Sequence, residues 1–333
     1  MRAQWDKITV ETRDGLASGI APVIISASRA TDIPAFYGEW FAGRLAAGYL
    51  ARTNPFNSNQ KQIISFAKTR AIVFWSKNPA PLERYLGQFD ERGINYYFTF
   101  TVNDYEQEGL EKSVPPLQER LATFRRLSRR LGSERVVWRF DPIIVGGSLT
   151  PERILEKIER IGDRLHRYTR KLVVSFVDIA KYRNVRENLR RSGSGDSEEP
   201  GPEAVRRIAE GIQRLNRDWG LGVASCAENV DLSAFGIAHN RCIDDDLMAR
   251  VFPHDAGLMA FLGRGAGPLP AAGAHAANPR KDRNQRESCG CVVSKDIGRY
   301  DTCPHHCVYC YANSSFSRAE AAWKRHTPGS EQL

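Results

Sequence analysis

The chain has 333 residues, of which 41% are hydrophobic and 26% charged, with a formal net charge of +9 and seven cysteines. This composition is that of a soluble globular protein with one large domain or two ordinary ones. It argues against an integral membrane protein, because no apolar run approaches the roughly 20 residues of a membrane-spanning helix. Residues 1–19 do not resemble a secretory signal, so we expect a cytoplasmic protein with reduced cysteines and no membrane partner.

Arginine supplies most of the positive charge, in runs such as Arg125-Arg126 and Arg129-Arg130. A basic surplus permits binding to nucleic acid or to an anionic substrate. The same arginines recur at helical spacing, which is typical of a solvated helix face. We favour the helix-face interpretation, and nucleic acid stays open as a partner.

Strands and helices are predicted to alternate after an irregular N-terminal arm at residues 1–20. The first strand is a β-branched run at 23–26, which ends in a polar segment before a helix near 36–47. The same order recurs along the chain. Further strands are predicted at 71–75, 96–100, 135–140, 171–177 and 222–226, and further helices near 81–92, 116–131, 151–165 and 202–219.

Six strands that alternate with helices predict parallel βα units. No glycine-rich phosphate-binding motif opens any of the helices, so a nucleotide-binding doubly wound sheet is less favoured. We therefore expect an α/β fold with a TIM-like (β/α) barrel, full or partial, over residues 21–254.

Two stretches interrupt the pattern, and neither has an apolar face to bury. Residues 190–202 are rich in Gly, Ser and Pro and predict a loop. Residues 255–280, Ala/Gly/Pro-rich from 263 on, predict a linker or insertion. The C-terminal segment, 281–333, is expected to pack on the barrel, with a strand at 292–297, a cysteine-rich loop and a helix at about 315–326.

The cysteine-rich loop carries Cys303, Cys307 and Cys310, three thiols within eight residues. Thiolates are the soft ligands of iron–sulfur clusters, and this spacing lets one loop bind three irons of a 4Fe–4S cluster. The fourth iron then has no ligand from the loop. The alternative is zinc, with His305 and His306 as additional ligands, but no second C-x2-C or histidine pair follows the loop.

Four cysteines remain outside the loop: Cys226, Cys242, Cys289 and Cys291. Four thiolates fully ligate a second 4Fe–4S cluster or a zinc ion. The flexible backbone of Gly290 lets the last two cysteines bend around one metal. Burial as small apolar side chains is the other interpretation, above all for the first two.

Polar residues follow the predicted strands, and in a barrel they would share one rim. They are Arg29, Asp32, Lys77, Asn78, Thr101, Arg139, Asp141, Ser175, Asp178 and Glu228. The three cationic side chains are suited to a carboxylate or phosphate. The alternative is structural ion pairing, of Arg29 with Asp32 and of Arg139 with Asp141. The candidate catalytic residues are Arg29, Asp32, Lys77, Arg139, Asp141 and Glu228, and Asn78 and Ser175 are candidates for cofactor binding.

Several segments in this order resemble the marker segments of the family called domain of unknown function 1848. They are 26–34 (SASRATDIP), 74–79 (FWSKNP), 138–142 (WRFDP), 226–228 (CAE), 242–244 (CID) and the tail from 284 to 313. The resemblance covers nearly the whole chain except the arm and the two insertions. It implies little about function, because the family is named for lacking one.

The cysteine loop also resembles that of radical S-adenosylmethionine (SAM) proteins of the spore-photoproduct-lyase type. The resemblance implies that the free iron holds the amino and carboxylate groups of SAM, and that the reduced cluster cleaves SAM to a 5′-deoxyadenosyl radical. Arg29, Lys77 or Arg139 would then face the SAM carboxylate, and Asp141 or Glu228 its ribose or amino group. Tyr309 would pack against SAM, and flavodoxin or ferredoxin would donate the electron.

This chain departs from that superfamily in two ways. The superfamily's cysteine loop follows the first strand, whereas here it follows the last, and no Gly-Gly-Glu run follows the next strand. A circular permutation would reconcile the first difference. It predicts that the strand at 292–297 lies beside the strand at 23–26.

Three hypotheses follow. The first is a radical-SAM-like iron–sulfur enzyme that abstracts hydrogen from a small or anionic substrate of unknown identity. The second is a nucleic-acid-associated protein with structural or redox-sensing clusters. The third is a zinc-stapled scaffold without catalysis.

Overall fold

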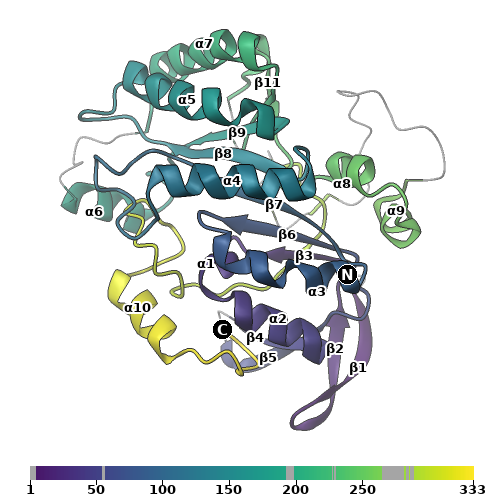
Figure 1. Ribbon diagram of the computed structural model, residues 1–333. Coiled ribbons are helices and arrows are strands. Elements are labelled where there is room, and N and C mark those ends of the chain that lie inside the picture. Colours follow the sequence, from purple (N-terminus) through teal and green to yellow (C-terminus); the bar gives the residue numbers. More distant parts are fainter. Residues whose placement is uncertain are drawn as a thin grey trace.

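A sheet of eight strands forms the centre of the protein in a computed structural model that describes residues 5–54, 57–192, 199–226, 228, 230–264, 281, 282, 285 and 289–333. The strand order is β11-β10-β9-β8-β7-β6-β3-β12, and all the pairings are parallel (Figure 1). The strands are β3 (Ile24–Ala27), β6 (Ala71–Ser76), β7 (Asn95–Thr101), β8 (Val136–Ile143), β9 (Lys171–Phe176), β10 (Gly222–Ser225), β11 (Ile237–His239) and β12 (Lys295–Asp296). The α/β class and the six predicted strands are thereby confirmed.

Helices follow most of these strands, as parallel pairing requires. They are α1 (Ile33–Phe36), α2 (Gly38–Ala47), the 3-10 helix η1 (Ala80–Tyr85), α3 (Leu86–Glu91), α4 (Leu117–Leu131), α5 (Pro151–Leu165), η2 (His166–Tyr168), α6 (Arg183–Arg191), α7 (Pro202–Trp219), η3 (Ser233–Phe235), α8 (Asp245–Val251), α9 (Ala256–Leu262) and α10 (Phe316–Arg325). Thr150 caps α5 by accepting the Arg153 N–H, as the sequence predicts.

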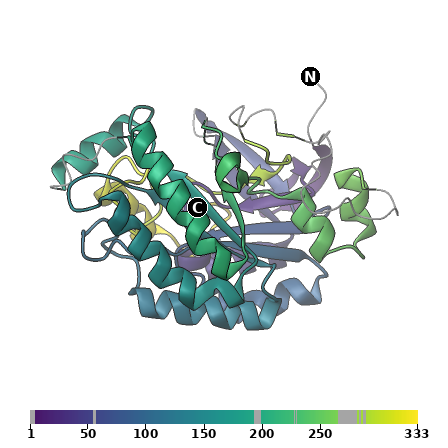
Figure 2. The same ribbon diagram turned by 90° about the horizontal axis from the view of Figure 1, so that it is seen from above.

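The two faces of the sheet are covered differently. Alternate side chains such as Phe74, Phe98 and Trp138 lie in the core shared with the helices. Their neighbours, including Val73 and Tyr97, lie in a second core with residues of α8 and α9. Figure 2 shows a layer of helices along one face of the sheet, with α8 and α9 (green) at one side of it. Residues of α8 and α9 therefore cover part of the face that would point into a barrel.

The last strand lies beside the first strand of this sheet, as the permutation predicts. Lys295 is opposite Ile25 and Asp296 is opposite Ser26, in parallel register. The Asp296 carboxylate also accepts hydrogen bonds from the hydroxyls of Ser26 and Ser28, both at 2.9 Å. The C-terminal cysteine segment is therefore fixed to the start of the fold.

The sheet is not a closed barrel. Its edges are β11 and β12, and within the described part of the chain no pairing joins them. The expectation of a full barrel is not met, and what the structure supports is an open parallel sheet with helices.

The predicted irregular arm is wrong for residues 6–20. They form a hairpin of β1 (Asp6–Thr12) and β2 (Gly15–Ala21), whose turn uses Gly15 with a φ of 104°. The hairpin joins β4 (Tyr49–Asn54) and β5 (Asn57–Ser65) in a second sheet of order β1-β2-β5-β4. Most residues of these strands are polar, and only a few, such as Leu50 and Ile64, are buried, so the sequence shows no long apolar run there.

The predicted linker also begins later than residue 255. Asp255 caps α9 by accepting the Leu258 N–H, and Leu258 and Leu262 are buried. Residues 265–280 lie outside the described residues, as do 193–198 of the predicted loop at 190–202. None of the described helices combines the length and the hydropathy needed to cross a membrane.

Candidate metal centre at the cysteine loop

The cysteine loop, residues 301–314, lies at the carboxyl ends of the central strands. The Tyr37 hydroxyl donates to the Thr302 carbonyl at 2.5 Å, and the Val308 N–H donates to the Leu110 carbonyl at 2.9 Å. From α6, Asn184 donates to the Asn313 carbonyl at 3.2 Å. Three separate parts of the fold therefore hold the loop against the rim, where the sequence predicts it.

Cys307 is buried and Cys303 and Cys310 are half-buried. Burial raises the pKa of each of the three thiols. Backbone N–H groups of the loop nevertheless donate to two of the sulfurs, from His305 to Cys303 and from Ala312 to Cys310. Because such bonds favour the thiolate while burial opposes it, the loop is suited to thiolates neutralised by a bound metal.

Neither histidine of the loop is placed as a metal ligand. His305 is buried, with Nε2 2.8 Å from the Asp32 carboxylate and Nδ1 3.3 Å from the Ser113 carbonyl. His306 has Nδ1 3.2 Å from the Ser113 hydroxyl and Nε2 3.3 Å from Glu320. Both rings therefore contact groups other than the thiols, although His306 Nε2 forms no hydrogen bond, and the structure lends the zinc interpretation no additional ligand.

The spacing of the thiols points the same way. Among the described residues, three ligand atoms come within 4.8 Å of one another only at Asp244, Asp245 and Asp246. Their carboxylates pair with Arg241 and Arg264. A tetrahedral zinc ion would hold its sulfurs roughly 3.8 Å apart. In this structure the three loop sulfurs are therefore not grouped at the spacing of ligands on one zinc ion.

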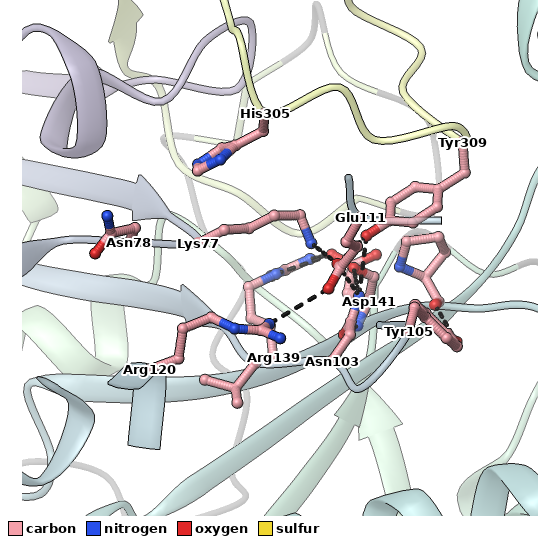
Figure 3. Close-up of polar contacts among 12 residues, drawn as sticks. Lys77, Asn78, Asn103, Tyr105, Glu111, Arg120, Arg139, Asp141, His305 and Tyr309 are labelled. Carbon is pink, nitrogen blue, oxygen red and sulfur yellow. Dashed lines mark hydrogen bonds and ion pairs between the residues drawn. The ribbon is translucent and has the colours of Figure 1, made fainter. Parts of the chain in front are cut away.

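A buried ionic network lies beneath the loop (Figure 3). Glu111 has a fully buried side chain, 2.8 Å from Lys77 Nζ and 3.4 Å from Arg120 Nη1. Burial by itself would raise the pKa of Glu111, but the two cations outweigh it and lower the pKa to about 2. Glu111 therefore stays ionised and holds Lys77 next to Cys307. The positive charge of Lys77 stabilises the Cys307 thiolate and opposes the rise in its pKa that burial causes.

Tyr309 belongs to the same network. Its hydroxyl donates to Glu111, and Asn103 Nδ2 donates to the Tyr309 hydroxyl at 3.2 Å. Lys77 Nζ lies 5.3 Å from the centre of the Tyr309 ring, which is only 7% exposed. The side chain predicted to pack against SAM is thus turned into the protein, and the exposed aromatic of the loop is Tyr311, at 42%.

Asp32 joins the loop to two strands. Besides His305, its carboxylate accepts the Ser76 hydroxyl at 2.7 Å and the Lys77 N–H at 2.8 Å, and it caps α1. The expected ion pair of Asp32 with Arg29 is not among these contacts. Asp32 therefore connects α1, the end of β6 and the cysteine loop.

Arg139 and Asp141 form the second expected ion pair, at the end of β8. Arg139 Nε donates to Asp141 at 2.9 Å, and the Ser175 hydroxyl donates to the same carboxylate. Asn103 connects this pair to Tyr309, because its Nδ2 also donates to the Asp141 carbonyl at 3.0 Å. The structure thus brings these rim residues together under the loop.

The other predicted rim residues make different contacts. Glu228 accepts the Phe176 N–H at 2.8 Å, and Asp178 accepts the Lys181 N–H at 3.1 Å. Asn78 lies to one side of the network in Figure 3. Arg29 follows β3, and its guanidinium carbon is 5.4 Å from the centre of the Trp75 ring.

Sequence reasoning missed Glu111, Arg120 and Asn184. Arg120 could have been found from the sequence. It lies one turn from Leu117 and from Phe124 on the apolar face of α4, and an arginine on such a face indicates a buried acidic partner. Glu111 and Asn184 lie in a loop and on a polar helix, where neighbouring residues reveal nothing of a long-range contact.

The arginine runs are partly neutralised at the surface. Arg126 pairs with Glu83 at 2.5 Å and Arg130 with Asp90 at 3.1 Å, and both arginines are on exposed parts of α4. This arrangement agrees with a solvated helix face.

The family assignment rests on residues 24–312, which match the model of a domain of unknown function, DUF1848. The chain belongs to this family. The matched range begins at β3 and ends within the cysteine loop, so it includes both cysteine sets and the whole parallel sheet. No curated protein and no solved structure matches the chain.

Proposed function

We propose that this DUF1848 protein is an iron–sulfur enzyme that binds a 4Fe–4S cluster at Cys303, Cys307 and Cys310 and uses it to cleave SAM reductively. The observation that carries the proposal is the position of this three-thiol loop at the carboxyl ends of a parallel sheet, where α/β enzymes keep their sites. The two histidines engaged elsewhere leave the set at three protein ligands.

When bound, such a cluster would pass one electron from a flavodoxin- or ferredoxin-like donor to SAM, whose carbon–sulfur bond breaks to give methionine and an adenosyl radical that takes a hydrogen atom from a substrate. The chain supplies position and charge. Lys77 places a positive charge beside Cys307, and that charge favours the reduced, more negative state. Glu111 fixes Lys77 there, and Asp32 fixes the loop through His305.

The carboxyl ends of β8 and β9 are the proposed place for the polar groups of SAM. Burial raises the pKa of Asp141, but Arg139 and Ser175 outweigh it and lower the pKa, so this carboxylate stays ionised. Its side chain is 24% exposed, enough to meet a bound amino group or ribose. We infer that the open sheet is a partial barrel whose mouth holds SAM between these strands and the loop.

The test is anaerobic reconstitution with iron and sulfide, followed by SAM and dithionite. The wild type is expected to be brown and to release 5′-deoxyadenosine. The variant C303A/C307A/C310A is expected to release none, and His306→Ala, in the same loop, is the matched control that keeps the activity. A loop that binds zinc or nothing under these conditions would remove the proposal.

A further inference from the structure

The four cysteines outside the loop come together on the face of the sheet against which α8 and α9 pack. Cys226 follows β10, Cys242 lies between β11 and α8, and Cys289 and Cys291 precede β12. The sulfurs of Cys226 and Cys242 are 3.3 Å apart. The thiol of Cys291 is hydrogen-bonded to those of Cys242 and Cys289. Thiols from three distant parts of the sequence therefore form one continuous row, here called the four-thiol group.

Hydrogen-bond donors surround this group. Arg139 Nη1 and Asn240 Nδ2 each donate to the Cys242 sulfur at 2.9 Å. The backbone N–H groups of Cys242 and Ile243 both point at the Cys291 sulfur at 3.3 Å. Neutral thiols are weak acceptors, so four donors on two sulfurs indicate that the surroundings are arranged for thiolates.

Two guanidinium groups face the same thiols. Arg139 and Arg29 lie 5.2 and 5.4 Å from the centre of the Trp75 ring. Arg29 Nη2 is buried without a hydrogen-bond partner, and the charges nearest to the Arg29 guanidinium include Cys291 and Cys242. A buried cation of this kind requires a compensating negative charge. Asp296 supplies part of that charge, and thiolates at Cys291, Cys242 and Cys289 would supply more.

We propose that Cys226, Cys242, Cys289 and Cys291 bind a second metal centre as four thiolates, with Arg29 and Arg139 as its counter-charges. Four thiolates around a divalent ion, or around a cluster core with two positive charges, keep two negative charges. Arg29 and Arg139 face this remaining charge, although each guanidinium also has a carboxylate near it, Asp296 for Arg29 and Asp141 for Arg139.

The centre has no position for a substrate on the metal, because four thiolates complete the coordination of a zinc ion or of a cubane cluster. The sulfur row is too long for one ion as it stands, since no three of its sulfurs lie within 4.8 Å of one another. The sulfurs of its closest pair, Cys226 and Cys242, are 3.3 Å apart, which is closer than the sulfurs of thiolates bound to separate irons of a cluster. Binding either metal would require these side chains to rotate, and metal analysis distinguishes the two.

The experiment uses the full chain with C303A/C307A/C310A, so that its result is independent of the cysteine loop. The protein is loaded anaerobically with iron and sulfide or with zinc alone, desalted, and analysed for metal. We expect about one zinc or about four irons per chain to remain. Adding C226A and C289S, at the two half-buried positions, is expected to remove that metal while circular dichroism shows that the fold persists. Metal below a tenth of these amounts, or metal unchanged by the added substitutions, would overturn the proposal.

Arg29→Gln tests the counter-charge without removing a ligand. In the same loop-free background we expect a chelator to extract the metal about tenfold faster, in the range found when groups that support metal ligands are removed. Arg70→Gln, at an exposed ion pair with Asp255, is the matched control. Equal extraction rates in both variants would show that Arg29 only stacks on Trp75.

Discussion

The two cysteine sets differ in number, origin and charge. The loop provides three thiols from one contiguous segment, next to one ammonium, Lys77, which a buried carboxylate holds in place. The four-thiol group provides four thiols from three separate segments, next to two guanidinium groups. A set of three leaves a metal position for a ligand, whereas a set of four completes the coordination. If both sets bind metal as proposed, the loop would form a reactive centre and the four-thiol group a saturated one.

Arg139 and Asn103 connect the two regions. Arg139 binds Asp141 on one side and the Cys242 sulfur on the other. Asn103 then links Asp141 to Tyr309 and Glu111 beneath the loop. A series of hydrogen bonds, some charged and some neutral, therefore runs from the Cys242 sulfur to the network beneath the loop.

The largest expected effect separates the two sets. Cys307→Ala removes one loop ligand, and we expect formation of 5′-deoxyadenosine to fall by at least about a hundredfold. The four-thiol group should keep its metal, since none of its ligands changes. Iron analysis and product assays on one preparation measure both. If iron were lost from both sets together, the two centres would not be independent.

A second substitution tests the charges beneath the loop. Glu111→Gln leaves Lys77 and Arg120 buried without their shared carboxylate, and we expect the free energy of unfolding to fall by about 3–5 kcal/mol. Glu159→Gln, on an exposed face of α5, is the matched control and should change it by less than about 0.5 kcal/mol. Denaturant titration of the metal-free proteins gives both values. A cost near that of the control would mean that Glu111 does not carry the network.

The same carboxylate predicts a pH dependence. The pKa of Glu111 falls from its ordinary 4.5 to about 2 in the folded protein. Its ionised form thus stabilises the fold above pH 4.5, and this contribution, on the order of 3 kcal/mol, is lost as the pH falls from about 4.5 to 2. Stability curves of wild type and Glu111→Gln should therefore converge over that interval. Parallel curves would contradict the assigned ion pairs.

The smallest effect concerns the histidines of the loop. H305A/H306A should keep its iron, because both rings bind other residues in the structure. We expect a stability loss of about 1–3 kcal/mol, from the buried contact of His305 with Asp32. Iron analysis and thermal denaturation measure the two effects. Loss of the metal would indicate that a histidine is a ligand of the loop centre. The loop would then not leave a metal position without a protein ligand.

The sequence predicted the regular part of the fold well, because its strands are buried on both faces and read as continuous apolar runs such as 71–75. It missed β4 and β5, whose polar residues are held by pairing with β2 and with the C-terminal tail, where the Ala51 N–H donates to Glu331. Such strands depend on contacts far along the chain, which local patterns do not reveal.

The grouping of the three loop thiols in one segment was visible from their spacing, because one loop carries all three, and their role as ligands stays a prediction. The four-thiol group could be counted from the sequence, but its assembly depends on how β10, the segment after β11 and the segment before β12 meet. Glu111 was not predictable, because its partners Lys77 and Arg120 come from a different strand and a following helix.

The most direct test of the central claim is electron paramagnetic resonance of the reduced protein with and without SAM. It uses the C226A/C289S variant, reconstituted with iron and sulfide, so that the loop carries the signal. We predict a signal of a reduced 4Fe–4S cluster that changes when SAM is added, because one iron has no protein ligand. A spectrum without this cluster, or one that SAM leaves unchanged, would contradict the assignment.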